Sequence, residues 1–272
     1  MMKSTKIWMA IVLVLAMVSV APAATNWWKG GPNDGGYPED TLWSNANNWI
    51  AWPPPEWIPT SAVPVAGQRV ELNRPAYATL INSDMAAVCG DLYVGYWDTH
   101  LLTVTGGSLA VNKLDVGSGE TAGAHVDHGY LVVSDGSISV GGAFAVGASN
   151  PWGGSGAVGT FYMSGGAIDV VGNLQIGKYA ISTGTAALVG GIITAASIEM
   201  TANGLLNVAG GILVLPGDQT ELVDGYIGLG WILGEAEYMT SGEYAGNTLV
   251  TPEPTTLALL GMGLVALLRR KG

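Results

Sequence analysis

Residues 102–117, with the sequence LTVTGGSLAVNKLDVG, decide the fold because the middle of the chain repeats this stretch with different side chains. The stretch holds three short apolar triplets, at 102–104, 109–111 and 114–116. A Thr-Gly-Gly-Ser turn separates the first two triplets, and only Asn112 and Lys113 separate the last two. Alternation within each triplet predicts a strand whose first and third side chains point inward and whose middle side chain points outward.

The same three-strand frame returns several times along the chain. Further copies begin at residues 131, 161, 186 and 206, and a degenerate copy begins at residue 80. In each clear copy the second strand starts seven residues after the first, whereas successive copies start 22, 29, 30, 25 and 20 residues apart. All the variation in length therefore falls at one corner, after the third strand.

Constant strands and one variable corner are expected of coils that stack on one another, because only a loop that projects into solvent is free to change length. We predict an all-β protein whose residues 80–215 form a right-handed parallel β-helix of five or six coils. An antiparallel β-sandwich is the alternative. The predicted interior stack consists of Leu109, Ile138, Ile168, Ile193 and Leu213.

Composition agrees with a narrow interior and excludes several classes of partner. The chain has 41 glycines, two phenylalanines and 11% charged residues. Its one cysteine, Cys89, falls at an inward position, which predicts a buried thiol. Between residues 24 and 251 there are 20 acidic residues and five Lys or Arg. Such a body repels polyanions, so nucleic acid is excluded as a partner and an anionic polysaccharide is disfavoured as a substrate.

Both ends of the chain differ from its middle. Residues 1–23 have the form of a secretory signal peptide, with Lys3 and Lys6 before an apolar run and small residues at its end. Residues 24–79 are rich in tryptophan and predict an N-terminal cap over the first coil. Residues 216–251 predict capping strands over the last coil.

The tryptophans also suggest an alternative function. Indole rings are wide and apolar, so Trp27, Trp28 and Trp43 are candidates to stack on the sugar rings of an extracellular glycan. On that hypothesis the protein is a carbohydrate-binding module of the cell surface. Covering the first coil is the structural interpretation of the same residues.

The last segment, residues 252–272, has three parts with separate physical roles. Pro252, Glu253 and Pro254 break regular structure, residues 257–268 form an apolar run that predicts a short transmembrane helix, and a basic cluster follows. That cluster consists of Arg269, Arg270 and Lys271. Basic residues of this kind hold the end of a membrane helix in the cytoplasm.

This order of parts resembles the PEP-CTERM sorting signal of exosortase substrates. The resemblance implies export, a transient anchor in the inner membrane, processing by an exosortase near residues 252–254, and delivery to the cell surface or the extracellular matrix. The coils and the Trp-rich segment are also similar to autotransporter-like β-helix repeats. Together these features predict a structural surface protein with no cofactor, and extracellular polysaccharide as a partner.

Catalysis is the remaining hypothesis, since β-helix enzymes commonly degrade polysaccharides. In the coil model Asp115, Ala145, Gln175 and Glu199 form one outward ladder, whose two acids are three steps, or about 14 Å, apart. Two-carboxylate hydrolysis needs a closer pair. The loop with His125, Asp127 and His128 carries possible metal ligands but no further cluster, so we expect neither a catalytic site nor a metal site.

Overall fold

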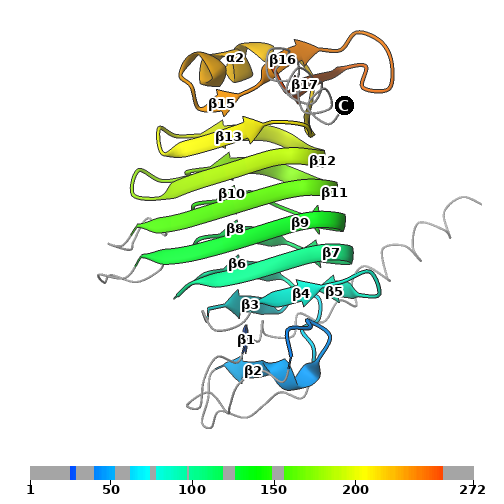
Figure 1. Cartoon of the computed structure of the whole chain (residues 1–272), viewed down its shortest axis with the longest axis vertical. Helices are drawn as coiled ribbons and strands as arrows, with labels where there is room; N and C mark the ends of the chain where they lie inside the picture. The colour runs from blue at the N-terminus through cyan, green and yellow to red at the C-terminus, as the bar shows by residue number, and fades with distance from the viewer. Residues whose placement is uncertain are drawn as a thin grey trace, which may run out of the picture.

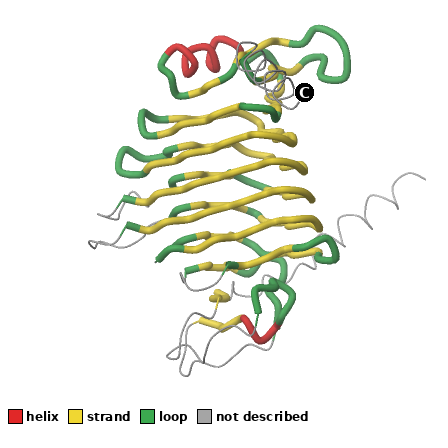
Figure 2. Tube along the Cα trace, viewed as in Figure 1, coloured by secondary structure: helices red, strands yellow, loops and turns green. Residues whose placement is uncertain are grey.

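The computed structural model describes residues 25–28, 40–52, 62–73, 78–96, 98–118, 126–148 and 156–253. Within these residues the protein is mostly β, and its strands lie in successive rows from the N-terminal to the C-terminal end of the molecule (Figures 1 and 2). The copies of the repeat pair through three parallel ladders, which we call the first, second and third columns; the copy that begins at residue 206 contributes only to the first two. The all-β prediction is thus confirmed.

The columns are built from these elements. The first column contains β4 (Thr79–Ile81), β7 (His100–Val111), β9 (Asp127–Val140), β11 (Ala157–Ile176), β12 (Thr183–Met200), β13 (Gly204–Val208) and β15 (Ile232–Leu233). The second contains β5 (Ala86–Val88), later parts of β7, β9, β11 and β12, and β14 (Ile212–Pro216). The third contains β1 (Thr25–Trp28), β3 (Arg69–Leu72), β6 (Asp91–Val94), β8 (Lys113–Val116), β10 (Phe144–Val146) and the ends of β11 and β12.

Within the columns, the strands pair in the register that the sequence repeat predicts. The five residues expected to stack inside pair with one another in parallel and are each at most 2% exposed. They are Leu109, Ile138, Ile168, Ile193 and Leu213. Parallel pairing through all three columns rules out the antiparallel sandwich for this part of the chain.

The expected Thr-Gly-Gly-Ser turn is not a loop. The first and second strands of a copy are continuous as β7, β9, β11 and β12, with register irregularities at the glycines. At Gly136 the backbone has a φ of +88°, and a Cβ atom there would lie 2.6 Å from the carbonyl carbon of Gly106 in the preceding copy. The chain therefore bends within a strand at a point where neighbouring copies touch backbone to backbone.

The degenerate first copy begins one residue earlier than its sequence suggests. Thr79, not Leu80, pairs with Leu102 and takes the inward position. A slip of one residue exchanges the two faces of a strand, so a polar residue becomes buried here. The Thr79 hydroxyl lies 2.9 Å from Nε2 of His100, which is also buried, and this hydrogen bond satisfies the inward polar group.

The N-terminal end enters the columns earlier than residue 80. Strand β3 pairs in parallel with β6, and β1 pairs in parallel with β3 and antiparallel with β2 (Trp49–Trp52). A short 3₁₀ helix, η2 (Ala46–Asn48), precedes β2. The predicted cap at residues 24–79 therefore contains strands of the third column. Residues 1–23, expected to be a signal peptide, lie outside the described residues.

The C-terminal end contains a helix in addition to the expected capping strands. Strands β16 (Glu235–Tyr238) and β17 (Asn247–Thr251) are present, but residues 220–228 form the helix α2 (Thr220–Gly228). The helical signal was in the sequence, because apolar residues recur at 222, 223, 226 and 227 with the spacing of one helix face. Val223 on this face is fully buried against the core.

We predict that Ile168→Asp destabilises the protein by several kcal/mol, because it places a carboxylate without a partner between Ile138 and Ile193. The matched control is Asp169→Ser, one residue along at an exposed position, which should be nearly silent. Thermal unfolding of the two variants tests the assignment of faces. Equal losses of stability would contradict it.

We predict that Gly136→Ala costs about 1–3 kcal/mol more than Gly242→Ala. Both glycines have nearly the same positive φ, +88° and +87°, so the backbone strain of an alanine is matched. Only Gly136 has backbone atoms within contact distance of the new Cβ atom, whereas Gly242 has none within 4 Å. Chemical denaturation measures the difference, and similar losses would show that contact between copies is unimportant.

Candidate functional site

Two of the three tryptophans proposed for glycan stacking lie inside the molecule. Trp28 and Trp43 are each 1% exposed, and both rings pack edge to face on Trp49, at 5.0 and 4.8 Å between centroids. Stacking on a sugar requires a ring face open to solvent, and neither ring has one. The backbone of Trp27 belongs to β1, and its side chain lies outside the described residues.

The three rings behave as a packed end to the core. Nε1 of Trp49 donates to the carbonyl oxygen of Trp43 at 2.9 Å, whereas the indole nitrogens of Trp28 and Trp43 are buried without a hydrogen bond among the described residues. A buried donor without a partner costs free energy, which the large apolar area of the rings offsets. Such packing supports the structural interpretation of these two tryptophans.

The outward side of the third column carries a group of charged and aromatic side chains in mutual contact. Arg69 lies over the rings of Tyr93 and Tyr96, 4.4 and 4.9 Å from their centroids, and its Nε is 2.7 Å from Oε1 of Glu71. Lys113, on the next strand but one, pairs with Asp115 and lies 4.9 Å from the Tyr93 ring. Two of the few cations of the body are thus held against one tyrosine.

Sequence reasoning placed Asp115 on an outward ladder, and the ladder is present, but its N-terminal part is not open to solvent. Asp115, Ala145, Gln175 and Glu199 pair in register as expected. Asp115 is 3% exposed, and Ala145 is fully buried. Glu199, at the exposed end, accepts hydrogen bonds from Asn173 at 2.5 Å and Gln175 at 2.6 Å.

Burial sets the protonation behaviour of this group. Burial raises the pKa of Asp115, and the positive charge of Lys113 opposes that shift without cancelling it. Burial acts to lower the pKa of Lys113, and the carboxylate of Asp115 outweighs it, so the net direction is upward. Oδ1 of Asp115 has no hydrogen-bond partner among the described residues.

Glu71 joins this face through β3, a contribution that sequence reasoning missed. Glu71 and Asp115 are two ladder steps apart, about 10 Å, with Tyr93 between them. Both acids are buried and ion-paired, so they do not form an open pair that could hold a substrate and a water. The signal was available, because Arg-Val-Glu-Leu at 69–72 has the same order of basic, apolar, acidic and apolar residues as Lys-Leu-Asp-Val at 113–116.

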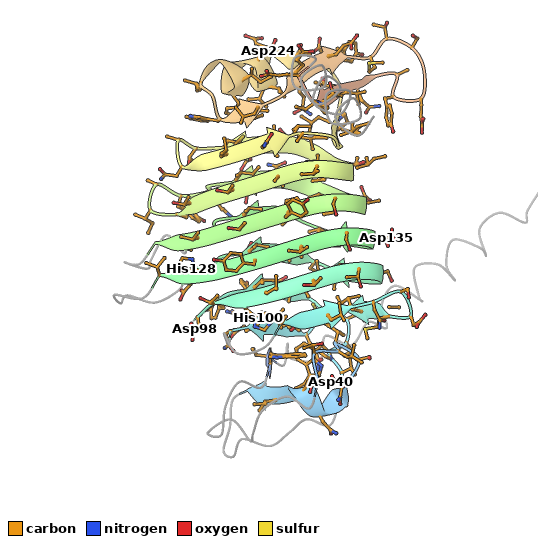
Figure 3. The ribbon with its side chains drawn as sticks, viewed as in Figure 1. Asp40, Asp98, His100, His128, Asp135 and Asp224 are labelled. Carbon is orange, nitrogen blue, oxygen red and sulfur yellow. The ribbon has the colours of Figure 1, made fainter. Side chains whose placement is uncertain are left out.

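The histidine loop shows no assembled ligand set in the part that the structure describes. His128 is half-buried and stacks on Tyr130 with centroids 6.5 Å apart, and His125 lies outside the described residues. No group of three or more His, Cys, Asp or Glu able to hold a metal occurs among the described residues. Figure 3 shows His100, His128 and four aspartates spread along the molecule. Cys89 is 3% exposed, as predicted, and burial raises the pKa of its thiol.

The sorting segment begins where the folded body ends. Strand β17 pairs with β14 on one side and β16 on the other, and Val250 within it is fully buried between Leu213 and Ala236. Thr251 is the last residue of β17, and Pro252 and Glu253 follow as half-buried residues. The first residues of the motif are therefore held at the surface of the C-terminal end.

The remainder of the segment lies beyond the described residues. Pro254, Arg269, Arg270 and Lys271, which the sequence assigns to the motif, belong to that part. Across residues 25–253, as far as the structure describes them, no helix is long and apolar enough to cross a membrane.

Comparison with known families found the PEP-CTERM protein-sorting motif at residues 250–271. The match confirms the sorting signal predicted from the sequence and supports export and processing by an exosortase. It covers the tail alone. Comparisons of the chain with curated proteins and with solved structures gave no match.

The third-column face predicts a specific pH dependence. A carboxyl group with a raised pKa binds its proton more tightly in the folded state, so its contribution to stability grows as the pH falls through the folded-state pKa. Asp115→Asn removes this term. The free energy of unfolding of the wild type minus that of Asp115→Asn should therefore increase between about pH 7 and about pH 4. Urea denaturation measures the difference, and a decrease towards acid would contradict the assignment.

Proposed function

We propose that the protein is a non-catalytic structural component of the cell surface or the extracellular polymeric matrix. In this proposal an exosortase removes the tail after the body has been exported, and the body is a right-handed parallel β-helix with autotransporter-like repeats. The observation that carries the proposal is the sorting motif at residues 250–271, which begins as the last strand of the body ends.

The position of the motif fits removal of the tail after folding. Processing near residues 252–254 would leave all of β17 in place, including the buried side chains of Leu249 and Val250. The body would therefore lose no core residue and no strand pairing. A protein that is sorted while folded needs such a boundary.

The tether between body and membrane is short in this proposal. Five residues separate Thr251 from Leu257, where the apolar run starts, and the six extended steps between these two residues span at most about 20 Å. The C-terminal end of the body would face the membrane until the tail is cut. The Trp-rich end, at the other end of the stack, would point away from it (Figure 1).

A structural role agrees with how the charged residues of the body are used. Arg69 and Lys113 are half-buried and are held in ion pairs with buried acids and in cation–π contacts with Tyr93. The cation–π contacts of Arg69 and Lys113 with Tyr93 cross between neighbouring strands and favour one register, since a slip would separate them. The third column then serves to align the coils.

We predict that removal of residues 257–271 releases the exported body without membrane retention, because the apolar anchor and its basic flank are lost. Replacing Pro252 and Glu253 by Ala should have the opposite result, an unprocessed protein held in the inner membrane of a host that has the sorting enzyme. Fractionation and mass measurement of the C-terminus distinguish the forms. Surface protein that still carries Arg269, Arg270 and Lys271 would rule out the proposal.

A further inference from the structure

The C-terminal end of the body carries an open hollow of about 600 Å³ on the outer side of α2. Its volume lies within the range of small-ligand sites. The residues that line it are Asp218, Gln219, Glu221, Leu222, Gly225, Tyr226 and Leu229. Nothing in the sorting function accounts for this hollow.

An exposed apolar and aromatic floor distinguishes the hollow from an ordinary polar helix surface. Leu222 and Leu229 are 40% and 62% exposed. The ring of Tyr226 stacks on Trp231, with centroids 5.6 Å apart and planes 22° apart, and the backbone N–H of Trp231 donates to the carbonyl of Tyr226 at 2.9 Å. One face of Tyr226 is thus packed, so the ring is held in a fixed orientation beside the hollow.

Gly225 is the most informative residue of the floor. Glycine in a helix interior costs about 1 kcal/mol relative to alanine, and nothing within 4 Å of Gly225 would obstruct a Cβ atom. Packing within the protein therefore does not require glycine here. Because Gly225 lines the hollow, the missing side chain leaves the helix backbone open to close approach by a ligand.

Charge excludes one class of ligand. Residues 217–253 contain seven acidic residues and no Lys, Arg or His, so an anionic ligand would be repelled. Asp218 and Glu221 at the rim offer carboxylate oxygens as acceptors for hydroxyl groups. One oxygen of Asp218 already accepts from the N–H and hydroxyl of Thr220, which lowers the pKa of Asp218 and keeps it ionised.

We propose that the α2 hollow binds a segment of neutral polysaccharide, with the apolar face of a sugar ring against Tyr226 and Leu222 and hydroxyl groups donating to Asp218 and Glu221. The inference deepens the proposed function by naming the class of polymer that the surface protein contacts. It rests on that function for its biological setting.

The test uses the full chain in mild detergent and isothermal titration calorimetry with four neutral hexasaccharides: cellohexaose, laminarihexaose, maltohexaose and xylohexaose. Hexagalacturonate is the anionic comparison. We expect at least one neutral probe to bind and the anionic probe not to bind. Gly225→Leu should weaken binding at least about tenfold by filling the hollow, while α2 becomes no less stable because leucine is the better helix former.

Two variants serve as matched controls. Gly228→Leu makes the same change at another helix position with open space, outside the lining of the hollow, and should bind as the wild type does. Tyr226→Ala should weaken binding about tenfold, whereas Tyr162→Ala, which removes an exposed tyrosine of β11 outside the hollow, should not.

Failure to bind any neutral probe, stronger binding of hexagalacturonate, or equal effects of Gly225→Leu and Gly228→Leu would each overturn the site. Binding is measured on purified protein and does not depend on processing. A protein that binds glycan but is not cut by the exosortase would therefore overturn the sorting proposal and leave the hollow as a binding site.

Discussion

Parallel register between copies is the constraint on which the rest of the structure depends. Each strand alternates its faces, so the inward positions of every copy must lie above those of the copy before. The stack through Leu109, Ile138 and Ile168 satisfies this condition, and the close backbone contact of Gly136 with Gly106 tightens it at the bend. This narrow core holds mainly aliphatic side chains, with Phe144 and Phe161 in its middle and three buried tryptophans at its N-terminal end.

The repeat predicted the columns because a strand that must stack on its own copies repeats its pattern in the sequence. The same logic explains where prediction failed. Thr79 is polar but inward, since its hydroxyl interacts with His100, and composition alone cannot reveal such a compensating partner. The apolar residues of helix α2 recur with a period of 3.6 residues, but only strands were expected in this segment.

The candidate sites also differ in how far the sequence alone could predict them. The sorting motif was predictable because its parts act through polarity and order along the chain, which the sequence states directly. Whether Trp28 exposes or buries its ring depends on contacts with distant segments. The burial of Asp115, on a ladder expected to face outward, depends on such contacts too. The hollow beside α2 depends on the absence of a side chain at Gly225, a feature that gains meaning only once its neighbours are placed.

The pairing of β17 has a mechanical consequence. In the proposed function a membrane anchor is attached beyond Thr251, and any force from it that acts along β17 meets hydrogen-bonded neighbours on both sides, β14 and β16. Hydrogen bonds between antiparallel strands run perpendicular to the strands, so such a force loads them together in shear and does not open them one by one. The point at which the chain is tethered is thus a point from which it is hard to unravel.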